Sequence, residues 1–141
     1  YDAFMEVAPE GAIEFFHGYT YSGHPLAGAA GLATLEVYRE EDLFARAAEM
    51  APYFQEAVHS LADCKNVIDV RNLGLMGAIE LESIAGKPTV RAMEAFQKAF
   101  EMGLLVRTTG DTIALSPPLI VERKHIDFIA ETVRDVIETV H

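Results

Sequence analysis

The sequence predicts an α+β domain in which helices cover one side of a small, mostly antiparallel sheet. Two segments, 43–61 and 122–140, repeat apolar residues at three-to-four spacing, which is typical of helices with one buried face. Residues 75–82 instead alternate, with acidic side chains at Glu80 and Glu82 on one face and apolar ones on the other, as in a half-buried strand. Helices therefore precede, separate and follow two pairs of short strands.

The chain begins with a segment, 1–7, that we expect to be the end of a helix stopping near Pro9. A second helix is predicted from Pro25 to about Tyr38, because proline is tolerated in the first turn. Gly28 and Gly31 inside it each cost roughly 1 kcal/mol relative to alanine. We expect close packing of this helix against a neighbouring element to compensate.

Asp42 is a good N-cap for the helix over 43–61, and Pro52 should kink or split that helix. A further helix is predicted over 89–102, stopped by Gly103. The residues expected to face inward from it are Met93, Phe96, Ala99 and Phe100.

The first predicted strand is 66–73, with Ile68 and Val70 on the face opposite Val67 and Asp69. The glycines that follow indicate a turn or bulge before the strand at 75–82, and these are Gly74 and Gly77. Two shorter strands, 104–107 and 112–115, are joined by a hairpin turn at Thr109-Gly110-Asp111, and Pro117-Pro118 ends the sheet.

The composition excludes several classes of function. A net charge of −11 argues against a nucleic-acid surface, which needs clustered Lys and Arg. No apolar run reaches the ~18 residues that a membrane span needs, and no secretory signal is visible. The single cysteine, Cys64, excludes an internal disulfide, and we interpret it as a small, half-buried residue at a helix end.

Hydroxyl side chains precede the helix at Pro25, where free N–H groups favour an anion. Tyr19, Thr20 and Ser22 could hold a phosphate there, but by pattern alone an ordinary capped helix is favoured. His17 and His24 form at most a metal pair without a third ligand, and we expect both to hydrogen-bond within the loop.

Arg107 is the second candidate binding residue, because it ends the predicted strand 104–107 and precedes a turn. An arginine there can bind a carboxylate through two parallel hydrogen bonds. A salt bridge to a neighbouring acid is an equally good interpretation, and Arg71 is a weaker candidate of the same kind. The sequence has no Ser/His/Asp order, HExxH motif or Gly-rich nucleotide loop.

Three stretches resemble the C-terminal part of the class III, or omega, aminotransferases. They are GYTYSGHPLAGAAGLATLEVY, VRNLGLMGAIEL and GLLVRTTGDTIALSPPLIV, and the resemblance covers essentially the whole chain. The family implies a fold type I enzyme that uses pyridoxal phosphate (PLP). The α+β part would then be the C-terminal small domain, residues 41–141, and residues 1–40 would be the tail of the large α/β cofactor domain.

The resemblance also implies roles for three residues. Thr20, with the backbone at Tyr19, would reach the phosphate of a PLP molecule held by the partner subunit of a homodimer or tetramer. Arg107 would bind the substrate carboxylate, as in the omega-amino acid–pyruvate subgroup. Ornithine-type relatives have an arginine nearer the Pro-Pro pair, where this chain has Ala114, so an amine donor and pyruvate are the expected substrates.

The family's Schiff-base lysine would lie upstream of Tyr1, and none of Lys65, Lys87, Lys98 and Lys124 is in a comparable context. The 141-residue chain alone is therefore expected to be inactive, and the parent enzyme to be cytoplasmic. Two alternatives remain open. One is a non-catalytic α+β binding or assembly module, and the other is a different class III PLP enzyme such as an aminomutase or decarboxylase.

Overall fold

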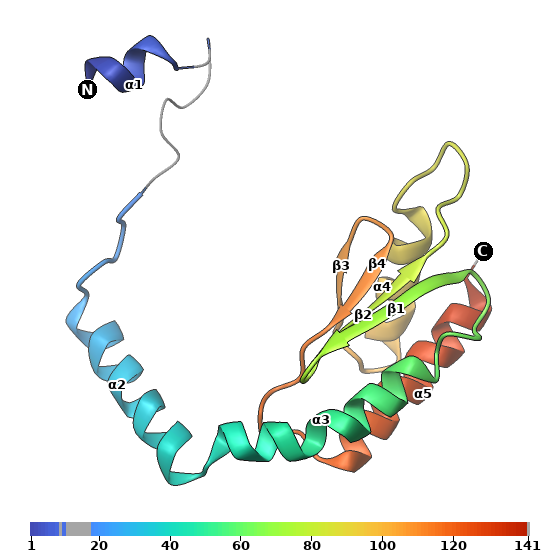
Figure 1. Cartoon of the computed structure of the whole chain (residues 1–141). Coiled ribbons are helices and arrows are strands. Elements are labelled where there is room, and N and C mark those ends of the chain that lie inside the picture. Colours follow the sequence, from blue (N-terminus) through green and yellow to red (C-terminus); the bar gives the residue numbers. More distant parts are fainter. Residues whose placement is uncertain (9, 11–17, 141) are drawn as a thin grey trace. The chain divides into compact units, whose positions relative to one another are not determined.

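The computed structural model describes residues 1–8, 10 and 18–140, which divide into two compact units, Tyr1–Glu36 and Val37–His141 (Figure 1). Two residues named in the sequence analysis, Pro9 and His17, lie outside the described residues. Each unit is described by itself. The assignment of residues 1–40 to the tail of a large cofactor domain stays a prediction.

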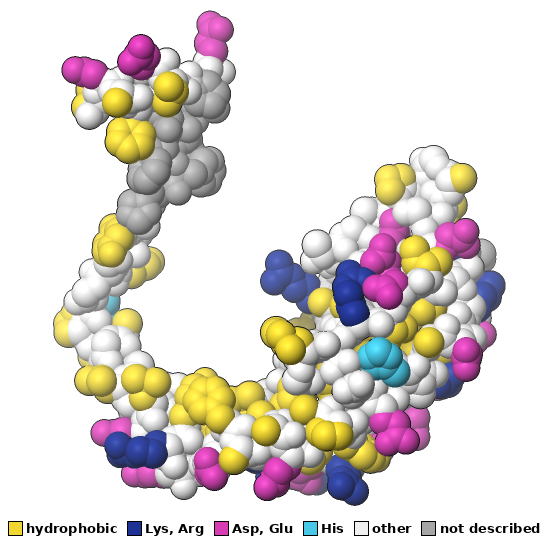
Figure 2. Space-filling model, viewed as in Figure 1, with side chains coloured by type: hydrophobic (Ala, Val, Ile, Leu, Met, Phe, Trp, Pro, Cys, Tyr) yellow, Lys and Arg dark blue, Asp and Glu magenta, His cyan; other side chains and the backbone are white. Residues whose placement is uncertain are grey.

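The first unit contains α1 (Asp2–Glu6) and most of α2 (Pro25–Glu40), as the sequence predicted. No residue of α2 is buried, and Figure 2 shows hydrophobic side chains exposed along it. A Cβ atom added at Gly28 or Gly31 would meet no atom of another described element within 4 Å. The expected close packing around these glycines is therefore not provided by the described part of this chain.

The second unit has the predicted α+β architecture. Its four strands form one antiparallel sheet in the order β1-β2-β4-β3. The strands are β1 (Val67–Leu73), β2 (Met76–Leu81), β3 (Arg107–Thr109) and β4 (Thr112–Leu115). The helices are α3 (Leu43–His59), α4 (Val90–Glu101) and α5 (Arg123–Thr139), and all three share one core with the sheet (Figure 1). No helix among the described residues is long and apolar enough to span a membrane.

One face of the sheet is covered by the helices and the other is open. Ile79 of β2 pairs with Ile113 of β4, and both side chains are buried. They lie in the same core cluster as Phe54 of α3 and Ile137 of α5. Because strand residues alternate between faces, the residues next to this pair in each strand face away from the helices.

The start of α3 and its proline behave differently from the sequence prediction. Asp42 does occupy the N-cap position, but it has a left-handed backbone (φ 49°) and its side chain makes no capping hydrogen bond. Pro52 lies inside α3, and the helix continues from Leu43 to His59 without being split. Phe54 and Val58 follow the proline by two and six residues, and their burial holds the helix together despite the lost hydrogen bond.

The predicted side-chain alternation of β1 is wrong, because the register of β1 against β2 shifts between Val67 and Asp69. This irregularity leaves Ile68 exposed and places both Val67 and Val70 against the core. An extra residue in one strand reverses the alternation on either side of it.

Gly77 is not part of a turn or bulge, as had been expected, but a paired residue within β2. The turn between β1 and β2 lies instead at Gly74, which has a φ of 57°. A Cβ atom at Gly77 would come within 3.2 Å of Phe54 and Val58 carbons. Gly77 therefore lets α3 approach the sheet closely.

The inward face of α4 also differs from the prediction. Ala99 is buried and Phe96 packs against the core, but Met93 and Phe100 are exposed. The rest of the buried face consists of Arg91, Ala92 and Ala95. Small alanine side chains let α4 lie close to the core, and the larger Met93 and Phe100 point outward. Gly103 follows the helix with a φ of 87°, as predicted for its stop.

The β3–β4 hairpin is confirmed, with Thr109 paired to Thr112 and Gly110 at a φ of 60° in the turn. Its first strand is shorter than predicted. Residues 104–106 are not in a strand, so Arg107 begins β3 rather than ending a strand. Asp111 in the turn fixes the neighbouring loop, since its carboxylate accepts hydrogen bonds from the Ser83 hydroxyl and the Thr89 N–H.

Candidate functional site

The open face of the sheet carries a row of four cross-strand neighbours. Arg71 of β1 pairs with Ala78 of β2, Ala78 pairs with Ala114 of β4, and Ala114 pairs with Arg107 of β3. Directly paired residues in antiparallel strands point to the same face. Both candidate arginines therefore lie on the open face, one at each edge of the sheet, with only methyl groups between them.

Arg107 borders a hollow of about 380 Å³. The lining comprises Leu104, Leu105, Val106, Arg107, Ala114, Leu115, Ser116, Pro117, Pro118 and Ile129. Arg107 is exposed and forms no salt bridge with any residue that the structure describes. An unpaired guanidinium beside an apolar hollow is suited to binding a carboxylate that carries a short carbon chain.

Arg71, by contrast, forms ion pairs with two neighbouring carboxylates. Its Nη1 donates to Asp69 Oδ2 at 2.5 Å and to Glu80 Oε2 at 2.8 Å. The hydrogen bond to Asp69, followed by that to Glu80, raises the pKa of Arg71 above its usual value. The salt-bridge alternative considered for both arginines thus holds for Arg71 and not for Arg107, within the described residues.

Tyr19 and Thr20 lie in a tight turn directly before α2. The Ser22 N–H donates to the Tyr19 carbonyl at 3.1 Å, and the His24 N–H donates to the Tyr21 carbonyl at 3.2 Å. Left-handed backbone at Tyr21 (φ 69°) and Gly23 (φ 72°) makes this turn. Thr20 is exposed and precedes the first residue of α2, Pro25, by five positions. Hydroxyl and helix N–H donors fit the chemistry of a phosphate.

The four lysines are all described, and none lines the hollow beside Arg107. Lys98 Nζ donates to the Thr139 carbonyl and pairs with Glu94, and Lys124 pairs with Glu122. Lys65 and Lys87 are exposed. None of the four is therefore placed to react with a molecule bound at Arg107.

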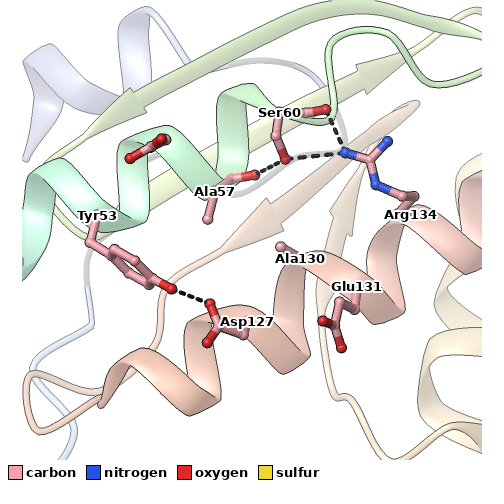
Figure 3. Close-up of a pocket in the computed structure, with 8 residues that line it drawn as sticks. Tyr53, Ala57, Ser60, Asp127, Ala130, Glu131 and Arg134 are labelled. Carbon is pink, nitrogen blue, oxygen red and sulfur yellow. Dashed lines mark hydrogen bonds between the residues drawn. The ribbon is translucent and has the colours of Figure 1, made fainter.

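A second hollow, of about 300 Å³, lies between α3 and α5 (Figure 3). The Tyr53 hydroxyl donates to Asp127 Oδ1 at 2.5 Å, and this hydrogen bond raises the pKa of Tyr53. Arg134 donates to the Ser60 carbonyl at 2.6 Å. These polar groups form hydrogen bonds with one another between α3 and α5. The hollow is better explained as helix packing than as the binding site of a non-catalytic module.

The family model for "Aminotransferase class-III" matches residues 2–137. The chain belongs to the class III aminotransferase family. It is 64% identical over 137 residues to an omega-aminotransferase of Caulobacter vibrioides, and 45% identical over 138 residues to a beta-alanine–pyruvate aminotransferase of Pseudomonas aeruginosa. Each alignment covers 97% of this chain, and the chain spans 31% of the length of each relative.

Comparison with solved structures agrees with the assignment of the chain to the class III aminotransferase family. A thermostable omega transaminase from Pseudomonas jessenii, solved as a 6-fold mutant, matches with a TM-score of 0.76 and 30% identity. The match covers 88% of this chain and 29% of the other. The resemblance stated from the sequence is thereby confirmed at the level of the family. The roles of Tyr19, Thr20 and Arg107 stay predictions.

Ser116 is the residue of this site that the sequence analysis did not single out. It lines the hollow beside Arg107, and its hydroxyl makes no hydrogen bond with a described residue. Ser116 stands two residues after Ala114 and therefore on the same side of the extended chain as the cross-strand partner of Arg107. The sequence does not show that Ala114 pairs with Arg107, so Ser116 could not be identified without the structure.

Proposed function

We propose that this chain is the C-terminal part of a PLP-dependent aminotransferase that moves an amino group from an omega-amino acid or a primary amine to pyruvate. The donor would leave as its oxo product, and pyruvate would leave as alanine. The similarity to relatives named omega-aminotransferase and beta-alanine–pyruvate aminotransferase supports this proposal. The observation that carries it within the chain is that Arg107 lies beside an apolar hollow and has no ion-pair partner among the described residues.

Arg107 would bind the carboxylate of pyruvate and, in the other half of the reaction, that of an omega-amino acid. Its guanidinium offers two parallel donors that match a carboxylate. The hollow's apolar lining would exclude water from this ion pair and strengthen it. Ala114 opposite Arg107 adds no competing charge, so a single arginine would orient the acceptor.

The turn before α2 would complete a cofactor site. The Thr20 hydroxyl and the backbone at Tyr19 would donate hydrogen bonds to the phosphate of PLP held by the partner subunit of a homodimer or tetramer. PLP, when bound, supplies the electron sink that labilises bonds at the amine carbon. We further propose that Gly28 and Gly31 of α2 pack against the large domain of the complete enzyme.

The reactive lysine would come from the rest of the complete protein, since the four lysines of this chain are paired or exposed away from Arg107. We therefore propose that the 141-residue chain alone is inactive. Residues 1–40 would belong to the large domain and 41–141 to the small domain of a fold type I enzyme. A cytoplasmic location remains part of the same proposal.

The test is amino transfer by the complete protein, purified with PLP and given beta-alanine and pyruvate. Formation of alanine is the expected result, and the 141-residue chain with PLP should form none. An aminomutase or a decarboxylase would instead convert the amine without consuming pyruvate. A binding module would do neither, so the three functions give different results in one assay.

A further inference from the structure

The hollow beside Arg107 is almost entirely apolar. Only two of its lining residues, Arg107 and Ser116, have polar side chains. Neither side chain has a hydrogen bond or ion pair to another residue that the structure describes. One residue with a guanidinium and one with a hydroxyl thus line the same hollow, and neither side chain is bonded to a described residue.

The backbone places these two donors on neighbouring positions. Ala114 pairs directly with Arg107, and Ser116 follows Ala114 by two residues at the end of β4. Two residues of extended chain span roughly 7 Å, which is about the reach of an arginine side chain. Pro117 and Pro118 follow Ser116 and have no N–H to donate. The Ser116 hydroxyl is therefore the side-chain donor on this wall of the hollow.

We infer that Ser116 is a second ligand of the substrate carboxylate, acting beside Arg107; this inference rests on the proposed function. A carboxylate accepts about four hydrogen bonds, and a guanidinium satisfies at most two of them in a bidentate pair. The Ser116 hydroxyl donates to an oxygen that Arg107 leaves open. The apolar walls formed by Leu105, Pro117 and Ile129 offer no other side-chain donor.

The consequence is substrate selection. A substrate carboxylate would form an ion pair with Arg107 and a hydrogen bond with the Ser116 hydroxyl. An aldehyde or a simple amine has no carboxylate and would form neither interaction. Ser116 therefore favours pyruvate and omega-amino acids over uncharged substrates of the same size. Ser116 is exposed and follows the last residue of β4, so we expect its replacement to leave the fold intact.

The experiment uses the complete protein with PLP bound and the variants Ser116→Ala, Ser116→Thr and Arg107→Ala. Binding of propionate is measured by calorimetry, and kcat and KM are measured for pyruvate and for propanal, which lacks the carboxylate. We expect S116A to weaken propionate binding and to raise the KM of pyruvate by about tenfold, with kcat unchanged. S116T keeps the hydroxyl and should have the propionate affinity and the pyruvate KM of the wild type. The kcat and KM for propanal should be unchanged in both S116A and S116T.

Unchanged propionate binding in S116A would overturn the inference, as would an equal loss with pyruvate and propanal, which indicates a structural role. The two proposals fail separately. If S116A and R107A both weaken propionate binding but the wild type transfers no amino group to pyruvate, the proposed function is wrong and the Ser116 site stands. If the wild type forms alanine and S116A binds propionate normally, only the Ser116 site is wrong.

Discussion

Arg71 and Arg107 lie in the same cross-strand row on the open face of the sheet, at its two opposite edges. Three strand spacings separate their Cα atoms, which is roughly 14 Å. Arg71 is paired with Asp69 and Glu80, whereas Arg107 has no ion-pair partner among the described residues. The two arginines are therefore a matched pair that differ in whether the guanidinium is available to a ligand.

Replacing Arg107 with alanine in the complete protein should lower kcat/KM for pyruvate by about 10- to 100-fold, because a charged hydrogen-bonded partner is lost. Arg71→Ala is the control, since it removes an exposed arginine from the same row. Its effect on pyruvate should stay below about twofold, because exposed ion pairs contribute little. Steady-state kinetics with pyruvate measure both. Equal losses in the two variants would contradict the carboxylate role of Arg107.

Replacing Thr20 with alanine should weaken PLP binding by about three- to tenfold, because one hydroxyl donor to the phosphate is removed. Thr20→Ser keeps the hydroxyl and should bind PLP like the wild type. Equilibrium dialysis of the complete protein against PLP measures the affinity. If T20A retains full affinity, the turn before α2 is an ordinary helix start.

Gly77→Ala should destabilise the protein by about 1–3 kcal/mol through overpacking. The added methyl group would lie 3.2 Å from Phe54 and Val58 carbons between α3 and the sheet. Ala78→Ser adds one atom to the next residue, on the open face, and should change stability by less than about 0.5 kcal/mol. Urea unfolding of both variants makes the comparison. If G77A were as stable as A78S, close packing of α3 against the sheet at Gly77 would be contradicted.

Cys64 should contribute to stability in a pH-dependent way. Burial raises the pKa of its thiol, and the Arg134 guanidinium, whose Nη1 lies 3.3 Å from Sγ, opposes that shift. Because the pKa of the thiol is higher in the folded than in the unfolded protein, the protonated thiol stabilises the folded state. This contribution is complete at pH values below the unfolded pKa of about 8.5. That contribution is lost as the pH rises through the folded pKa.

The free energy of unfolding should therefore fall more steeply above about pH 8.5 in the wild type than in Cys64→Ala. Denaturant unfolding at a series of pH values measures the two slopes. Parallel slopes would mean that burial leaves the thiol unperturbed. Because Cys64 is the single cysteine, its alkylation should also be slow in the folded protein and fast after unfolding.

Much of the architecture followed from the sequence, because amphipathic spacing and turn residues are local signals. The helices α3 and α5, the β3–β4 hairpin and the apolar face of β2 opposite Glu80 were all predicted correctly, and that face carries the buried Ile79 and Leu81. The face of β1 was not, and that of α4 was predicted only in part, since Phe96 and Ala99 face the core but Met93 and Phe100 do not. The register shift near Ile68 depends on pairing with β2, and the choice of the alanine face of α4 depends on how closely the core lets it approach.

The candidate site shows the same division between local and non-local information. Arg107 was identified from its residue type and its place before a turn. Its partners in the hollow were not, because the pairing of Arg107 with Ala114 fixes where Ser116 lies. Whether each guanidinium is available to a ligand also needed the structure, since only the structure places Asp69 and Glu80 beside Arg71.

The transfer of isotopically labelled nitrogen tests the central claim most directly. The complete protein with PLP is given beta-alanine labelled at its amino nitrogen together with unlabelled pyruvate, and the products are analysed by mass spectrometry. The account predicts that the label appears in alanine and that alanine formation equals the loss of beta-alanine. Label that stays in a rearranged or decarboxylated amine, with no labelled alanine, would contradict it.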